Sequence, residues 1–225
     1  MRLILASTSP ARLALLRAAG VEPEVVPSAV DEPATVAQAE RVRGRPLTAA
    51  EMVLLLARAK AEAVSGRRPA ASEDALLLGG DSAFELDGAV YGKPGTAAVA
   101  RERWIRQRGR TGVLYSGHWL IDLREGAGTG ARLDSGRGKV TSASVQFAAD
   151  LTDAEIDAYV ATGEPLAVAG AFTIDSLGGP FIERIEGDPS TVVGLSLPTL
   201  RRLVRACGVE WTDLWSPRRP HDAIG

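Results

Sequence analysis

The segment at residues 3–20 constrains the fold of this chain more than any other stretch. Its apolar run at 3–5 is typical of a short strand that is buried on both faces. Ser9 in the N-cap position and Pro10 at the first helical position then predict a helix that ends at the glycine of position 20. This arrangement directs free backbone N–H groups and the side chain of Arg12 out of a sheet edge. We therefore expect an anion site, most often a phosphate site, at this turn.

The composition indicates a globular protein without an obvious polymer or membrane partner. A length of 225 residues suits one well-cored domain, or two lobes that share a cleft. A net charge of −2 argues against a protein that coats nucleic acid or binds a membrane surface. The single cysteine, Cys207, excludes an intramolecular disulfide, and its helical spacing with apolar residues favours a buried structural thiol. There is no leader sequence and no apolar run near the ~20 residues of a membrane span, so we expect a cytoplasmic protein.

Strand and helix patterns alternate along the chain, which predicts an α/β fold. The predicted strands lie at 3–5, 24–27, 76–78, 82–86, 89–91, 113–123 and 139–147, with two glycines ending the strand at 76–78. The predicted helices begin at 10, 48, 96, 152 and 198, and residues 34–46 form a loop or a poorly packed helix. A glycine-rich stretch at 125–138 is expected to be a hairpin tip. We predict one domain over 1–210, followed by a loosely ordered tail at 211–225.

Two familiar kinds of active site are disfavoured by the side chains present. His118 lies on a predicted strand and His221 in the tail, and neither accompanies a Ser or Cys nucleophile in a strand-turn-helix elbow. The chain also lacks the Cys and His spacing of a structural zinc site. Carboxylates and cations at the ends of elements remain as candidates.

Among the carboxylates, Asp81 follows a buried strand and two glycines, where packing gives no reason for a charge. Asp31 and Glu32 lie in a predicted turn, and together with Asp81 they could hold a hard cation such as Mg²⁺. Arg12 opposes the helix dipole, so its position calls for an anionic ligand. Taken singly, each of these residues is an ordinary turn or surface charge. Taken together, they suggest a polyphosphate site with a metal.

Several short motifs, in sequence order, resemble those of the Maf family. They are SxSPxR at 7–12, the acidic pair at 31–32, ARAKA at 57–61, GDS at 80–82, GKPG at 92–95 and YSG at 115–117. Two longer blocks, at 155–165 and 169–200, extend the resemblance over residues 3 to about 207. The resemblance implies an elongated, twisted mixed β-sheet flanked by helices, with two lobes and a central cleft, similar to inosine triphosphate pyrophosphatases. It also implies a house-cleaning nucleoside triphosphate pyrophosphatase, a Mg²⁺ or Mn²⁺ cofactor and a homodimer.

The resemblance assigns roles to individual residues. By position, Asp81 corresponds to the proton acceptor, and Glu32 with Asp81 to the metal carboxylates. The residues that face the phosphates correspond to Ser7, Ser9, Arg12, Lys60 and Lys93. The spacing of Lys60 itself places it on the flank of the apolar stripe of its predicted helix, from where the ammonium can reach along the surface into a neighbouring cleft.

Three positions depart from the branch of the family that prefers dTTP and UTP. That branch has arginine, threonine and glutamine where this chain has Ala11, Ser82 and Asp175. Because an ionised carboxylate only accepts hydrogen bonds, Asp175 suits a base that presents donors, such as guanine, its methylated form or the amino group of cytosine. The base preference therefore differs from that of the dTTP and UTP branch.

Two other classes of function are weighed against the enzyme. A nucleotide-binding regulator of cell division, acting through a protein partner, would use the same pocket without turnover. Such a regulator has no physical need for Asp81, Glu32 and both lysines together, which favours the enzyme. A kinase is disfavoured because the chain has no GxxxxGK[ST] loop.

Overall fold

The computed structural model describes residues 1–67, 74–124 and 136–216. In these ranges seven strands form one mixed sheet with the order β2-β1-β3-β5-β6-β7, and β4 also pairs with β3. β1 runs parallel to β2 and β3, whereas the other pairs are antiparallel. The strands are β1 (Arg2–Leu5), β2 (Glu24–Val25), β3 (Ala75–Leu86), β4 (Ala89–Tyr91), β5 (Thr111–Asp122), β6 (Arg137–Phe147) and β7 (Ile182–Glu186).

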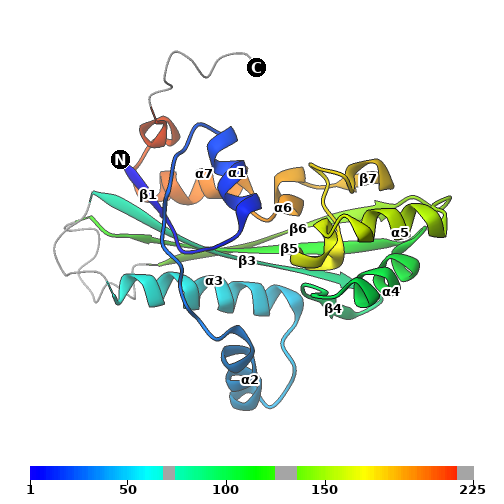
Figure 1. Cartoon of the computed structure of the whole chain (residues 1–225). Coiled ribbons are helices and arrows are strands. Elements are labelled where there is room, and N and C mark those ends of the chain that lie inside the picture. Colours follow the sequence, from blue (N-terminus) through cyan, green and yellow to red (C-terminus); the bar gives the residue numbers. More distant parts are fainter. Residues whose placement is uncertain (68–73, 125–135, 217–225) are drawn as a thin grey trace.

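Helices cover both faces of the sheet, with α3 on one face and α1, α6 and α7 on the other (Figure 1). The predicted mixed α/β fold, with a sheet flanked by helices, is confirmed. The α-helices are α1 (Pro10–Ala18), α2 (Glu32–Arg43), α3 (Ala49–Ser65), α4 (Ala97–Gln107), α5 (Asp153–Ala161), α6 (Pro189–Val193) and α7 (Leu197–Ala206). Short 3-10 helices are η2 (Glu164–Ala167), η3 (Ala169–Ala171), η4 (Gly179–Phe181) and η5 (Trp211–Leu214). In the described ranges no helix has both the length and the apolar content to cross a membrane.

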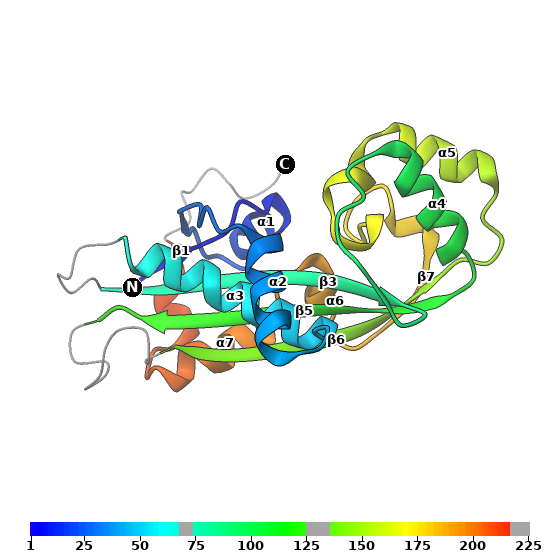
Figure 2. The ribbon, with the colours of Figure 1, turned by 90° about the horizontal axis from the view of Figure 1, so that it is seen from below.

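The two ends of the sheet have separate hydrophobic cores. At one end, α4 and α5 pack on the sheet through an aromatic cluster centred on Trp104, which contacts Phe147 and Tyr159 edge to face. At the other end, α1 and α7 pack on one face of β1 and β3, and α3 packs on the opposite face. Figure 2 shows α4 and α5 at one end of the long strands and α1, α2 and α3 toward the other.

β3 is one continuous strand, so the prediction that two glycines end it after residue 78 is wrong. Both glycines lie inside β3, where they allow close packing. A Cβ on Gly79 would lie 2.0 Å from the carbonyl oxygen of Ala57 on α3. On the neighbouring strand β5, a Cβ on Gly117 would lie 2.2 Å from the carbonyl oxygen of Val53, also on α3. The glycines therefore let α3 lie directly against the sheet.

Two further segments differ from the expectations or refine them. α2 has no buried residue, which matches the poorly packed helix rather than the loop. The described part of the expected tail, residues 211–216, contains η5 and packs on the body of the protein. Leu214 is buried, and the backbone N–H of Ser216 donates to the carbonyl of Gly20. The expected hairpin tip falls mostly on residues outside the described ranges, as do 217–225 with His221.

One edge of β3 is unpaired in its middle. On this edge β1 pairs with β3 as far as Leu78, and β4 pairs with it from Phe84 onward. β5 follows the opposite edge along residues 76–85. Between Leu78 and Phe84 no described strand pairs with this edge, over about 20 Å at roughly 3.3 Å per residue. We call this stretch the edge gap. Asp81 lies at the middle of the edge gap, and its side chain contacts Lys60 on α3.

Candidate functional site

Asp81 is the central side chain of the edge gap. It is only 8% exposed, and its Oδ1 accepts a hydrogen bond of 2.7 Å from Nζ of Lys60. Burial raises the pKa of Asp81, and the nearby charges of Lys60 and Arg12 oppose this shift without cancelling it. A buried carboxyl group with raised proton affinity, on a stretch of strand with one unpaired edge, is a candidate for general acid or base chemistry.

Lys60 joins Asp81 to a second carboxylate. It lies on α3, is 7% exposed, and its Nζ lies 2.7 Å from both Asp81 Oδ1 and Glu32 Oε1. The sequence placed Lys60 on the flank of the helix with its ammonium reaching along the surface, whereas the structure buries it between two acids. Glu32 is the first residue of α2, and its side chain is about half exposed. The adjacent Asp31 caps α2 through the backbone N–H of Ala34. The two carboxylates therefore converge on one ammonium, with the Glu32 side open.

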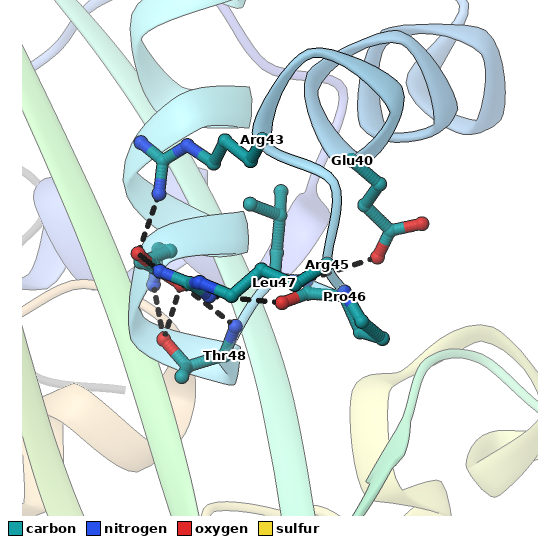
Figure 3. A network of polar contacts seen from close by, with 7 residues as sticks. Glu40, Arg43, Arg45, Pro46, Leu47 and Thr48 are labelled. Carbon is teal, nitrogen blue, oxygen red and sulfur yellow. Dashed lines mark hydrogen bonds and ion pairs between the residues drawn. The ribbon is translucent and has the colours of Figure 1, made fainter.

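Polar contacts at the far end of α2 fix the helix that carries Glu32. Arg43 and Arg45 both pair with the carboxylate of Glu51, in the first turn of α3 (Figure 3). Glu51 also forms a capping box with Thr48, and the hydrogen bonds from Arg45 and Thr48 hold the pKa of Glu51 below its usual range. Because α2 buries no side chain, these ion pairs and the Glu32 contact with Lys60 determine where α2 lies.

Arg12 points into the fold rather than away from the helix N-terminus. Its Nε donates to the carbonyl of Gly194 at 2.8 Å, and its two terminal nitrogens donate to Ser7 Oγ at 3.1 Å and Ser82 Oγ at 2.8 Å. Burial lowers the pKa of Arg12, while the charges of Asp81 and Glu32 raise it. The negative charges of these two carboxylates favour a cation in the first helical turn, so its presence there does not require an external anion. Arg12 thus connects the turn after β1 with β3 and with the residue after α6.

The serines of the first turn have defined partners. Ser9 caps α1 by accepting the backbone N–H of Arg12 at 3.4 Å, as the sequence predicts. Ser7 is buried, and its Oγ accepts the backbone N–H of Ser9 at 3.2 Å as well as the Arg12 guanidinium. The turn is therefore held rigidly at the β1 border of the edge gap.

The other candidate residues stand apart from this cluster. Lys93 is exposed, two residues after Tyr91, the residue of β4 that pairs with Phe84 at the second border of the edge gap. Asp175 is exposed, and Ala11 is half-buried in the first turn of α1. In the described part of the chain, neither Lys93 nor Asp175 contacts the cluster around Asp81.

The structure adds Ser116 to the polar residues of the site and gives Ser82 and His118 partners that the sequence did not predict. Ser82 Oγ lies 3.0 Å from Ser116 Oγ, and Ser116 donates to the carbonyl of Thr191 at 2.8 Å. His118, two residues along β5, accepts the backbone N–H of Ser196 at 2.8 Å. The available signal was the alternation of Ser116 and His118 on one face of a buried strand, since period-2 polar residues share a face. Together these contacts hold the segment around α6 on the sheet beside Arg12.

The carboxylates offer only part of a metal site. In the described ranges no group of three or more His, Cys, Asp or Glu side chains is placed to hold an ion. Asp81 and Glu32 both contact Nζ of Lys60, so the point on which they converge is occupied by an ammonium. Carboxylate oxygens suit Mg²⁺ or Mn²⁺, and a cation at this pair would bind beside Lys60 and take its other ligands from water and from substrate phosphates.

Comparison with known proteins identifies the family. Residues 2–207 match the family model described as Maf-like protein. The chain belongs to the Maf family. It is 66% identical over 216 residues to a protein of Leifsonia xyli subsp. xyli, and the aligned region covers 96% of this chain and 97% of that protein. It is 54% identical over 217 residues to a protein of Salinispora tropica, at 96% and 88% coverage. For a protein of Streptomyces coelicolor the identity is 47% over 216 residues, at 96% and 95% coverage.

The three relatives share one name, nucleoside triphosphate pyrophosphatase. The resemblance to the Maf family that the motifs indicated is thereby confirmed, over nearly the full length of the chain. In this Maf chain the SxSPxR, GDS and GKPG motifs lie along the edge gap, at its β1 border, its middle and its β4 border.

Proposed function

We propose that this chain hydrolyses the phosphoanhydride between the α- and β-phosphates of a nucleoside triphosphate, giving a nucleoside monophosphate and pyrophosphate. The observation that carries the proposal is Asp81, a buried carboxyl group with a raised pKa, which accepts a hydrogen bond from Lys60 and lies in the middle of the unpaired edge of β3. The name of the relatives supports the same reaction. We also propose that the two ends of the sheet act as two lobes, with the edge gap as part of the substrate cleft between them.

In the proposed mechanism Asp81 is the proton acceptor for the attacking water. The water oxygen forms a bond to the α-phosphorus, the P–O bond of the α–β anhydride breaks with its electron pair leaving on pyrophosphate, and the water proton passes to the carboxylate of Asp81. Lys60 orients this carboxylate through its 2.7 Å hydrogen bond. Because the transition state spreads charge over the phosphate oxygens, the positive charges of Lys60 and Arg12 stabilise it electrostatically.

The turn after β1 and the loop after β4 are proposed to bind the polyphosphate. Ser7 and Ser9 lie at one border of the edge gap, and Lys93 lies in the loop that begins at the other. A divalent cation held by Asp81 and Glu32 would neutralise charge on the substrate phosphates. From the family resemblance we also propose that the protein is a homodimer that acts on free nucleotides in the cytoplasm.

Base preference is proposed from Ala11, Ser82 and Asp175. Ala11 leaves space where the dTTP and UTP branch has an arginine, and Ser82 is held by Arg12 and Ser116. Asp175 is exposed, and as a carboxylate it accepts hydrogen bonds from a base that donates. These features favour guanine, methylated guanine or cytosine nucleotides, and a role in removing non-standard nucleotides.

The proposal is tested by pyrophosphate release from a panel of standard and modified nucleoside triphosphates, with Mg²⁺ and with Mn²⁺. Asp81→Asn keeps the size of the side chain but removes the proton acceptor, so we expect nucleotide binding to persist and turnover to fall by about 10²- to 10⁴-fold. Asp157→Asn is the matched control, because Asp157 is an exposed carboxylate on α5 whose ion pair with Arg101 lies on the surface, where such pairs contribute little to stability.

Near-normal turnover in Asp81→Asn would refute the role of Asp81. A wild-type protein that binds nucleotides and releases pyrophosphate from none of them would favour the nucleotide-binding regulator instead.

A further inference from the structure

The side-chain carboxylate of Glu164, the first residue of η2, accepts several hydrogen bonds. The mechanism above does not explain them. Its Oε1 accepts from Tyr159 Oη at 3.0 Å, from Thr173 Oγ1 and from the backbone N–H of Gly178 at 3.2 Å. Its Oε2 accepts from Ser176 Oγ at 2.7 Å and from the backbone N–H of Leu177 at 3.3 Å. One carboxylate therefore organises five donors.

Four of these five donors belong to a single loop, residues 173–178. Thr173 lies at the start of the loop, and Ser176, Leu177 and Gly178 lie at its end, so the carboxylate closes the loop on itself. The closure is tight, because a Cβ on Gly178 would lie 2.6 Å from the carbonyl oxygen of Thr173. Asp175 lies between the two bonded ends and is exposed. Glu164 thus presents Asp175 on the outer side of a rigid loop.

The loop begins beside the edge gap. Phe172 packs edge to face on Phe84, with ring centroids 5.2 Å apart. Phe84 is the β3 residue at which pairing with β4 begins, so it marks one border of the gap that holds Asp81. Ile174, the second residue of the loop, packs on the same aromatic core. The loop that carries Asp175 is therefore anchored next to the proposed substrate cleft.

The loop geometry depends on the charge of Glu164. All five partners donate, so they suit an ionised carboxylate that only accepts. Burial favours the neutral acid, but the hydrogen bonds from Thr173, Ser176, Tyr159 and Leu177 outweigh it and lower the pKa of Glu164. The carboxylate is therefore charged at neutral pH. A neutral amide of the same size cannot accept all of these bonds.

We propose that Glu164 is a positioning residue for base selection, which holds the loop at 173–178 so that the Asp175 carboxylate meets the donor groups of the base. The inference rests on the proposed function and goes beyond it by assigning selectivity to a residue that does not touch the substrate. Its chemical consequence is specific. Loss of the clamp reduces discrimination between bases, while the proton acceptor and the phosphate-binding turn stay in place.

The test is the ratio of kcat/KM between the best nucleotide and the next best, compared in the wild type and in Glu164→Gln. Glutamine keeps the size of the side chain but turns one accepting oxygen into an NH₂ donor that faces other donors. We expect the ratio to fall at least 10-fold, mainly through a higher KM for the preferred nucleotide. Glu155→Gln is the matched control, because glutamine can replace Glu155 in the capping box of α5.

A double-mutant cycle with Asp175→Asn separates positioning from general stability. If Glu164 acts through Asp175, then Glu164→Gln leaves the ratio unchanged in the Asp175→Asn background. Ser176→Ala removes one exposed donor and keeps the fold, and we expect an intermediate fall of about 2- to 5-fold in the ratio. Hydrogen exchange at the amides of Leu177 and Gly178 should accelerate at least 10-fold in Glu164→Gln.

Two results would overturn the inference while the proposed function stands. One is an equal loss of kcat/KM for every nucleotide in Glu164→Gln, which would make the clamp purely structural. The other is an unchanged ratio with accelerated amide exchange, which would show that loop order does not set selectivity. A wild-type protein without pyrophosphate release would refute the proposed function itself and this inference with it.

Discussion

His118 gives a quantitative prediction for the pH dependence of stability. Its side chain is fully buried, Nε2 accepts the backbone N–H of Ser196 at 2.8 Å, and Nδ1 lies 3.2 Å from the carbonyl of Lys139. Both contacts are satisfied only by a neutral imidazole with its proton on Nδ1, because protonation of Nε2 breaks the bond from Ser196. Burial, assisted by the charge of Arg12, lowers the pKa of His118 to about 4, against the opposing effects of Asp188 and of backbone hydrogen bonds.

The sign and size of the effect follow from proton linkage. Between pH 4 and 6.5 the unfolded chain binds a proton at this histidine and the folded protein does not, so the free energy of unfolding rises with pH. The contribution of His118 is fully present above pH 6.5 and is lost as the pH falls toward 4. With an unfolded pKa of about 6.5, the loss between pH 7.5 and pH 5 is about 2 kcal/mol.

Urea unfolding at pH 7.5 and pH 5, for the wild type and for His118→Gln, measures this loss. Glutamine can accept the N–H of Ser196 and does not titrate, so the variant lacks only the His118 part of the pH dependence. We expect the wild type to lose about 2 kcal/mol more than the variant between the two pH values. The chain has two histidines, so a His221→Gln variant assigns the His118 signal for titration by NMR. A measured pKa near 6.5, or equal pH dependence of the two proteins, would refute the reasoning.

Two further substitutions test the packing of α3 and the buried ion pair. Gly79→Ala places a methyl group 2.0 Å from the carbonyl oxygen of Ala57, so we expect the free energy of urea unfolding to fall by about 1–3 kcal/mol. The control Gly92→Ala has open space around its Cβ and should change this free energy by under about 0.5 kcal/mol. Lys60→Met leaves the Asp81 carboxylate buried without its ion-pair partner, which raises the pKa of Asp81 further. The loss of unfolding free energy in Lys60→Met, relative to the wild type, should therefore be larger at pH 8 than at pH 5. Combining Lys60→Met with Asp81→Asn should remove that pH dependence. Equal losses at both pH values would contradict the proposed pairing.

Features that depend on neighbours in the sequence could be predicted. The N-cap at Ser9 and the capping boxes that begin at Thr48 and Thr152 all form as expected. These signals lie within three or four residues of one another, so a helix start can be inferred without knowledge of the fold. The strand and helix order followed from the same local patterns. The family could also be inferred, because its motifs are short and keep their order.

Features that depend on tertiary packing could not be predicted. Gly79 was interpreted as a strand end, because a glycine that ends a strand and one that admits a helix backbone have the same local sequence. Lys60 was placed on a helix flank, because its partner Asp81 is 21 residues away and meets it only once α3 lies against β3. The loop closed by Glu164 was missed for the same reason, since its donors at Thr173 and Gly178 follow 9 and 14 residues later.

The proposed binding of a polyphosphate would need more positive charge than the side chains around Asp81 provide. The two carboxylates, Asp81 and Glu32, are balanced by the two cations, Lys60 and Arg12, so this cluster of four side chains is formally neutral. Arg12 already donates to three protein oxygens, and Lys60 donates to Asp81 and forms an ion pair with Glu32. A triphosphate adds several negative charges beside this neutral cluster. The repulsion among these phosphate charges is stronger where the surroundings are partly buried. We propose that the additional compensating charge comes from the exposed Lys93 and from a divalent cation shared between the carboxylates and the phosphates.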